Sequence, residues 1–195
     1  MIKFILPEGA TPLDPNEMEG LIPNISTQRE LNQLEKANNF IAYNWAIKSR
    51  KLKKELVSIH GVKLLHKKMF DEIWEWAGQF RKTEKNIGTI LSHQVQEEVK
   101  KLCDDINYQI SLGVSNWKEL TVTTHHRLVS IHPFSNGNGR HARLFCDLLL
   151  IYNKQSPLSW GASDLIENDL IRKNYIQCLR LADKGDIKPL IEFCS

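Results

Sequence analysis

Residues 132–143 combine a histidine that could act as a base, a glycine-rich turn and two arginines within twelve positions. They read His-Pro-Phe-Ser-Asn-Gly-Asn-Gly-Arg-His-Ala-Arg. A neutral imidazole can accept a proton near physiological pH, and guanidinium groups bind phosphate through paired N–H donors. These residue types in this order predict chemistry on a phosphate group, with His132 as a general base.

The glycines predict an anion site built from the backbone. Gly137 and Gly139 can adopt positive φ, which lets successive N–H groups point toward one place. Apolar residues at helical spacing occur on both sides of the turn, so it leads from one helix into the start of the next. Unpaired N–H groups and the positive end of the helix dipole favour anions there. Arg140 and Arg143, at i and i+3, are expected on one face of that first turn.

A purely structural interpretation of the same residues is also available. Gly-Asn-Gly is common in turns, and an isolated histidine is more often structural than catalytic. Asp147 lies four residues after Arg143 and offers it an ordinary helix ion pair. The order of the parts, with His-Pro at a helix end before the glycine turn and the arginines, favours the phosphate site.

The segment resembles the signature of the Fic family, His-Pro-Phe-x-(Asp/Glu)-Gly-Asn-Gly-Arg-x-x-Arg. The matching residues are His132, Pro133, Phe134, Gly137, Asn138, Gly139, Arg140 and Arg143. Residues 74–81 are similar to the family's segment before its flap, and the resemblance covers residues 60–193. Residues 10–23 resemble more narrowly the Fic subgroup called mobile mystery protein B.

The resemblance implies a protein adenylyltransferase, which moves AMP from ATP to a Tyr, Ser or Thr hydroxyl of a target protein. ATP is the implied substrate and Mg²⁺ the implied cofactor. The target is expected to dock along a β-hairpin flap at residues 79–91, since strand addition aligns a hydroxyl through main-chain bonds. The implied roles are a base (His132), a loop anchor (Phe134) and phosphate ligands (Gly137, Asn138, Gly139, Arg140 and Arg143).

Asn136 departs from the family pattern, which has Asp or Glu at this position to bind magnesium. An amide oxygen can ligate Mg²⁺, but it attracts the ion less than a carboxylate does. Three outcomes are open: weaker metal binding with retained activity, a changed reaction, or a binding fold with little chemistry. The alternatives to AMP transfer are therefore another phosphate-group transfer, AMP removal, or a non-catalytic partner-binding protein. The last would belong to a mobile-element or toxin–antitoxin system with a small helix-turn-helix partner.

Two segments resemble the family's inhibitory pattern, Ser/Thr-x-x-x-Glu-Gly/Asn, whose glutamate pairs with the second arginine of the signature. Residues 163–168 fit every letter but also form an ordinary helix N-cap, which is the favoured interpretation. Residues 26–31 miss the last letter. Glu30 and Glu35 are accordingly candidate inhibitory partners of Arg143, with a capping acid and a solvated helix charge as their alternatives.

Helical periodicity dominates the chain and predicts an all-α, mainly helical fold as one structural unit. An N-terminal arm and helix (1–59) pack on a Fic core (60–195), and residues 1–26 are expected to be extended. The first long helix carries a broad apolar stripe that includes Phe40 and Ile41. The expected helices span 27–50, 62–76, 93–112, 116–131, 138–153, 165–182 and 186–193.

The composition is consistent with a single globular domain. The chain has 195 residues and a net charge of +3 with mixed signs, which predicts no preference for nucleic acid or anionic membranes. Its apolar stretches are too short to span a bilayer, and residues 1–8 lack the apolar core of a signal peptide. We therefore expect a cytoplasmic protein without direct membrane contact.

Overall fold

The computed structural model describes residues 13–85, 90–161 and 169–195. Within these ranges the chain is mainly helical, as predicted. The helices are α1 (Pro15–Glu19), α2 (Gln28–Lys48), α3 (Arg50–Glu55), α4 (Ile59–Phe70), the short 3-10 helix η1 (Ser92–Gln94), α5 (Val95–Ser111), α6 (Trp117–Ile131), α7 (Asn138–Tyr152), α8 (Asp169–Ala182) and α9 (Lys188–Phe193).

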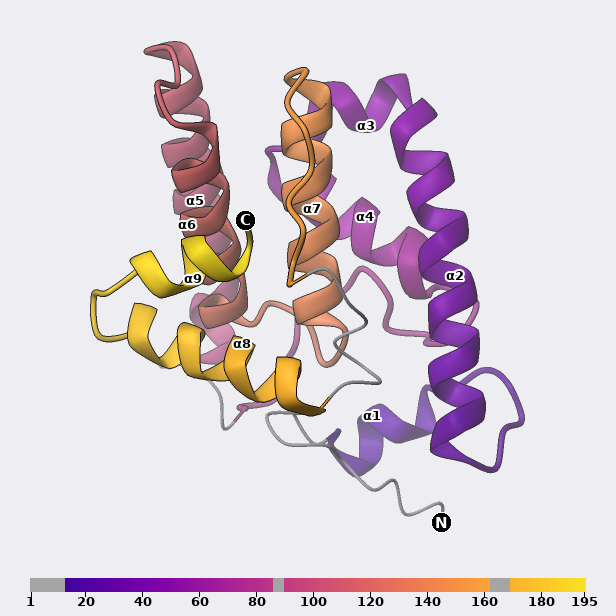
Figure 1. The fold of residues 1–195 in the computed structure, drawn as a ribbon. Coiled ribbons are helices and arrows are strands. Elements are labelled where there is room, and N and C mark those ends of the chain that lie inside the picture. The colour runs from indigo at the N-terminus through magenta and orange to yellow at the C-terminus, as the bar shows by residue number, and fades with distance from the viewer. Residues whose placement is uncertain (1–12, 86–89, 162–168) are drawn as a thin grey trace.

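The α7 helix occupies the middle of the molecule. It packs against α6 on one side and against α2 and α4 on the other, while α5 packs against α6 and α8 against α9 (Figure 1). Other helices surround α7, so its buried side chains point in several directions. These side chains include Leu144, Phe145, Cys146, Leu148, Leu149 and Leu150. The loop that connects α6 to α7 is therefore held between two well-packed helices.

The first long helix turns a different face to the core than its apolar stripe predicts. Phe40 is 69% exposed and Ile41 is 63% exposed, while Leu31, Ala42 and the carboxylate-bearing Glu35 are buried. The prediction of an inward stripe was wrong for Phe40 and Ile41, because small residues let α2 approach α4 and α7 closely.

Several predicted boundaries differ from those observed. The predicted helix 27–50 ends at Lys48, because Ser49 is extended and its hydroxyl caps the new helix α3 at Leu52. The predicted helix 62–76 lies instead at 59–70 as α4 and is followed by turns. Residues 1–26 are not wholly extended, since α1 begins at Pro15 with a capping box formed by Asp14 and Glu17.

The expected β-hairpin is not seen. In the described ranges no β-strand occurs, and the isolated antiparallel bridge joins Leu21 to Trp74. Residues 86–89, at the expected hairpin turn, and the capping or inhibitory candidate at 163–168 lie outside the described residues. In the described parts of the chain, no helix combines the length and apolarity needed to cross a bilayer.

Candidate active site

His132 ends α6 in a left-handed backbone conformation, with φ 52° and ψ 59°. This conformation is uncommon for a residue other than glycine and persists only where neighbouring groups hold it. Arg81 supplies two such contacts. Its Nε donates to the His132 carbonyl at 2.8 Å, and its backbone N–H donates to the Pro133 carbonyl at 2.9 Å.

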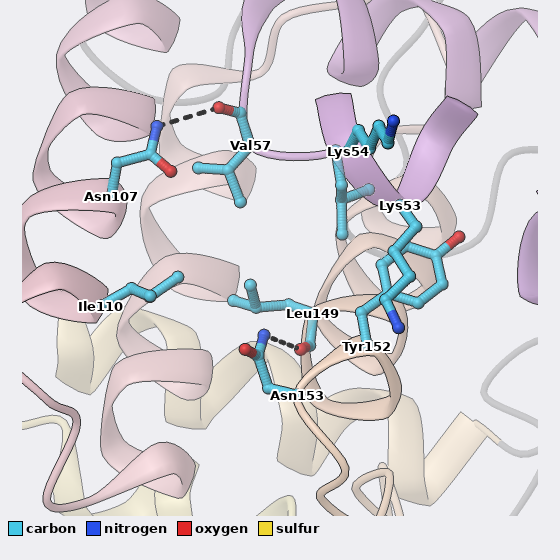
Figure 2. Close-up of a pocket in the computed structure, with 9 residues that line it drawn as sticks. Lys53, Lys54, Val57, Asn107, Ile110, Leu149, Tyr152 and Asn153 are labelled. Atoms are coloured by element: carbon cyan, nitrogen blue, oxygen red, sulfur yellow. Dashed lines mark hydrogen bonds between the residues drawn. The ribbon is translucent and has the colours of Figure 1, made fainter. Parts of the chain in front are cut away.

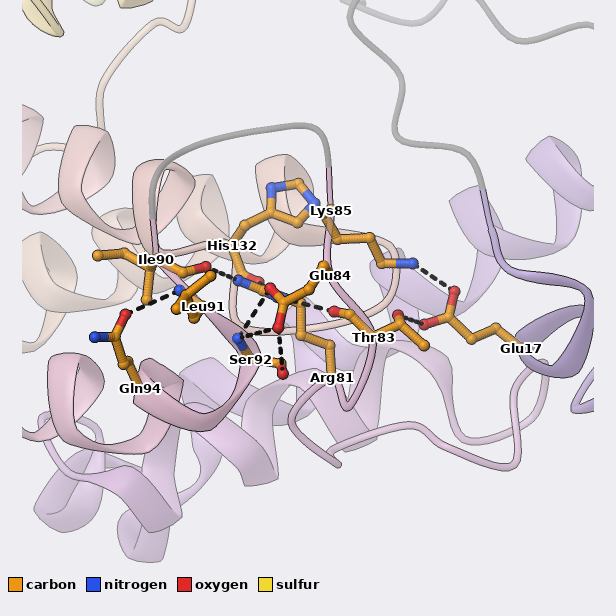
Figure 3. Close-up of polar contacts among 10 residues, drawn as sticks. All are labelled: Glu17, Arg81, Thr83, Glu84, Lys85, Ile90, Leu91, Ser92, Gln94 and His132. Carbon is orange, nitrogen blue, oxygen red and sulfur yellow. Dashed lines mark hydrogen bonds and ion pairs between the residues drawn. The ribbon is translucent and has the colours of Figure 1, made fainter.

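The Arg81 guanidinium also joins the two ends of the predicted flap. It donates to the carbonyls of Thr83 and Ile90 and reaches the Glu84 carboxylate at 3.4 Å (Figure 3). Its side chain is only 1% exposed, so these acceptors replace the water that a buried cation loses. Arg81 therefore joins residues 83–84 and Ile90 to the same loop that carries His132.

The His132 imidazole is neutral at physiological pH. Burial lowers its pKa to about 4, the nearby charges of Arg81 and Lys85 act in the same direction, and a hydrogen bond to the Val129 backbone opposes them. A neutral imidazole has one N–H and one nitrogen lone pair. The neutral ring thus has the nitrogen lone pair that a general base requires.

Asn138 folds the loop onto itself. Its Oδ1 accepts from the Phe134 N–H at 2.8 Å, and its Nδ2 donates to the Phe134 carbonyl at 2.7 Å. The Asn138 side chain is buried in this pair of bonds, so its backbone N–H is the group left for a phosphate. Phe134 is fully buried, in the position expected of a loop anchor.

The start of α7 is suited to bind an anion. Its N-cap residue is Gly137, with φ 78°, and among the described residues no side chain caps the helix. The first N–H groups of a helix lack internal acceptors, so those of Asn138, Gly139 and Arg140 face the loop. A Cβ on Gly137 would lie 2.5 Å from the Phe70 ring, which makes glycine necessary there, whereas one on Gly139 would meet only Arg143 at 3.6 Å.

His66 supports the loop from behind and was not predicted from the sequence. Its Nδ1 accepts from the Gly78 N–H at 3.0 Å, so its Nε2 carries the proton and donates to the Asn136 carbonyl, also at 3.0 Å. Its ring stacks on Phe134 with centroids 3.7 Å apart. Burial first, then the charges of His141 and Arg140, lowers the His66 pKa well below its usual value, although the bond to Asn136 opposes this.

Arg140 already has an acidic partner. Its Nη1 lies 2.6 Å from Glu35 Oε2 on α2, and the other Glu35 oxygen accepts from Trp74 Nε1 at 3.3 Å. The Arg140 guanidinium also lies over the Phe70 ring, 5.3 Å from its centroid. Glu35 is almost completely buried and is thus not a solvated helix charge.

The structure corrects the expected partner of the inhibitory candidates. Glu35 contacts Arg140, the first arginine of the motif, rather than Arg143. Glu30 accepts from the backbone N–H groups of Ser26 and Thr27 at 2.8 and 2.9 Å, which is the capping role given as its alternative.

Arg143 has a different neighbour from Arg140. Its guanidinium lies over the Tyr175 ring of α8, 5.9 Å from the centroid, and its charge opposes the burial that raises the pKa of the Tyr175 hydroxyl. That hydroxyl also lies 2.8 Å from His125 Nε2. The two arginines, expected on one face, therefore contact different helices, α2 for Arg140 and α8 for Arg143.

A separate hollow of about 330 Å³ lies at the far end of α7, between α3, α5 and α7 (Figure 2). Tyr152 and Asn107 line it, and Lys53 lies over the Tyr152 ring. Tyr152 is fourteen residues from Asn138, about 20 Å along a helix that rises 1.5 Å per residue. The hollow is therefore too distant to take part in chemistry at His132.

Comparison with known proteins identifies this arrangement. Residues 56–150 match the family model described as Fic/DOC family. These residues belong to the Fic/DOC family. The protein adenylyltransferase fic-1 of Caenorhabditis elegans is 28% identical over 122 residues, which are 61% of this chain and 22% of the relative. The chain thus matches only about a fifth of that relative's length.

Solved Fic structures share the fold. A structure of Caenorhabditis elegans Fic-1 (residues 134–508 of that protein) superposes with a TM-score of 0.65 at 24% identity, over 92% of this chain and 51% of that one. The N-terminal Fic domain of a Bartonella quintana effector with bound ADP gives 0.67 at 17% identity, over 89% and 87%. The fold likeness therefore extends beyond the Fic/DOC match to most of this chain.

Proposed function

We propose that this chain is a protein adenylyltransferase, which transfers AMP from ATP to a Tyr, Ser or Thr hydroxyl of a target protein. One observation carries the proposal: a buried neutral imidazole lies at one end of a loop whose other end is an uncapped helix start with two arginines. Relatives named protein adenylyltransferases and an ADP-bound Fic domain support it.

In the proposed reaction the target hydroxyl oxygen attacks the α-phosphorus of ATP. The bond from that phosphorus to the oxygen bridging to the β-phosphate breaks, and pyrophosphate leaves. His132 accepts the hydroxyl proton as the new P–O bond forms. The N–H groups at the start of α7 and the guanidinium groups of Arg140 and Arg143 would bind the phosphates, so most of the rate enhancement comes from position and charge.

Among the described residues, the side chains do not form a magnesium centre by themselves. In the described ranges no group of three acidic, histidine or cysteine side chains could hold a metal ion. Asn136 is the one candidate ligand of the loop, and its Oδ1 already accepts from the Gly137 N–H at 2.6 Å. We therefore assign Mg²⁺ no catalytic step here and treat Asn136 as a doubtful ligand of an ion brought by the nucleotide.

The ion pair between Glu35 and Arg140 supports the further proposal that the chain is autoinhibited. A phosphate that binds Arg140 must compete with the Glu35 carboxylate, which lies 2.6 Å away and is almost completely buried. The same pair, with the neutral Asn136, supports the second candidate, a Fic-fold binding protein of little activity. Target docking along residues 79–91 is part of the first proposal.

Incubation with ATP labelled at the α-phosphate, in the presence of Mg²⁺ and cell lysate, tests the function. We expect label on the chain itself or on lysate proteins. His132→Asn is the matched control, because asparagine tolerates the left-handed backbone while removing the base. Equal label in both proteins would exclude His132 from the reaction. If wild type and Glu35→Gln both stay unlabelled and calorimetry detects no ATP binding, the binding-protein alternative is favoured.

A further inference from the structure

Glu17 lies on α1, outside the Fic/DOC match, yet its carboxylate contacts the segment beside His132. Thr83 Oγ1 donates to Glu17 Oε1 at 2.7 Å, and Lys85 Nζ donates to Oε2 at 2.5 Å (Figure 3). The Asp14 N–H donates to Oε2 at 2.8 Å. A carboxylate accepts about four hydrogen bonds, so these three partners satisfy most of its capacity.

Both members of the pair between Glu17 and Lys85 have lost most of their water. The Lys85 side chain is 3% exposed and that of Glu17 is 9% exposed. An ammonium group in such a place is tolerated only when paired, and removal of its partner leaves an uncompensated buried charge. Without Glu17, Lys85 would move toward solvent, and residues 83–85 would move with it.

The helix that carries Glu17 is itself firmly attached. The Gly20 carbonyl accepts from the Glu75 N–H at 2.9 Å, and the Glu17 carbonyl accepts from Trp76 Nε1 at 2.9 Å. A Cβ on Gly20 would lie 2.9 Å from the Trp76 ring, which shows how closely the two segments approach. Glu17 therefore lies on a firmly attached helix and can hold residues 79–85 in place.

We infer that Glu17 is a positioning residue, which holds residues 79–85 (the flap arm) in place beside the loop that carries His132. Arg81 joins the flap arm to the backbone of His132 and Pro133. Glu17 joins Thr83 and Lys85, at the other end of the flap arm, to α1. The flap arm is thus held at both of its ends. The consequence for a docked target rests on the proposed function, whereas the positioning itself does not.

The protonation state of Glu17 agrees with this role. Burial by itself raises its pKa, but the hydrogen bonds from Lys85, Thr83, Asp14 and Ser135 together outweigh burial and lower the pKa. The carboxylate is therefore charged at neutral pH and stays paired with Lys85.

Hydrogen exchange of the full chain, measured by mass spectrometry on peptides covering the flap arm, tests the inference. Glu17→Gln keeps the capping bond to Asp14 but leaves Lys85 without a counter-charge, so exchange of the flap-arm amides should rise at least about tenfold. Lys85→Met should also raise it. The double variant buries no unpaired charge and should return to within about threefold of wild type. Glu19→Gln, on the exposed side of α1, is the matched control and should change nothing.

Unchanged exchange in Glu17→Gln would overturn the inference, as would a double variant that exchanges faster than either single variant. Thermal melts separate flap-arm loosening from loss of the fold. If Glu17→Gln does not fold, the double variant alone tests the inference. The inference requires that the double variant folds and that its flap-arm amides exchange slowly, as in wild type. Exchange is measured without nucleotide, so a wild type that never transfers AMP refutes the proposed function and leaves this result intact.

Discussion

Glu35 and Arg140 form an ion pair across 105 residues of sequence, with 2.6 Å between the carboxylate and the guanidinium. Glu35 is buried, whereas the Arg140 side chain is 19% exposed and can regain water. The contact thus puts a negative charge beside a residue proposed to bind phosphate. The ATP affinity of a Glu35 variant tells whether the pair opposes ATP or positions Arg140 for it.

Glu35→Gln is expected to bind ATP about tenfold more tightly, because it removes the competing charge and keeps an oxygen for Trp74. Calorimetry with ATP and Mg²⁺ measures this, with thermal melts to confirm folding. Glu30→Gln is the control, since Glu30 lies on the same helix but is exposed and caps the helix start through Thr27. Weaker ATP binding in Glu35→Gln would show that the pair positions Arg140 and does not inhibit.

Asn136→Asp should increase the affinity for magnesium-bound ATP by about tenfold, because a carboxylate attracts Mg²⁺ more strongly than an amide and still accepts from Gly137. In EDTA the added negative charge should instead weaken ATP binding. Titrations with and without Mg²⁺ check both signs. Asn136→Ala, which has no side-chain oxygen, is the comparison. The same affinity for all three proteins would remove residue 136 from metal binding.

Replacement of His66 should separate its hydrogen bonds from its bulk. His66→Leu leaves the part-buried Gly78 N–H and Asn136 carbonyl without this partner, which costs up to about 1–3 kcal/mol for each group. His66→Gln offers both a donor and an acceptor and should recover part of the loss in free energy of unfolding. Urea denaturation measures both variants. Equal stability of the two would mean that stacking on Phe134, and not hydrogen bonding, is what His66 contributes.

His132 should titrate far below an ordinary histidine. Its pKa of about 4, caused first by burial, keeps it neutral from neutral pH down to about pH 4. Any transfer activity limited by this base should therefore show no inflection near pH 6.5 and should fall only as the pH approaches 4. An NMR titration of the ring signals, assigned with His132→Asn, measures the pKa without requiring activity. A midpoint near 6.5 would contradict the buried geometry.

The helix–loop–helix at the centre of the site was predictable because its signals are local. Apolar periodicity on both sides of 132–137, and the glycine at 137, specify where α6 ends and α7 begins. The break at Ser49 and the end of α4 at Phe70 were not predicted, because tertiary packing and capping decided where those helices end.

The supporting residues of the site could not be found from spacing. Arg81 contacts His132 from 51 positions away in sequence, and His66 contacts Asn136 from 70 positions away. No spacing in the sequence indicates either contact. Glu35 resembles a surface charge on an amphipathic helix, and only the approach of Arg140 explains why it is buried. The resemblance to the Fic signature named the reacting groups but not what holds them.

Phe70 ends α4 as a fully buried core side chain, and its ring lies under both Gly137 and the Arg140 guanidinium. The Phe70 ring thus limits how closely the turn at Gly137 can approach the core, and it also supports the Arg140 guanidinium. Any repacking of this part of the interior, even by a residue of similar volume, would shift the turn and the cation together. Stability and ligand affinity should consequently change in parallel at position 70.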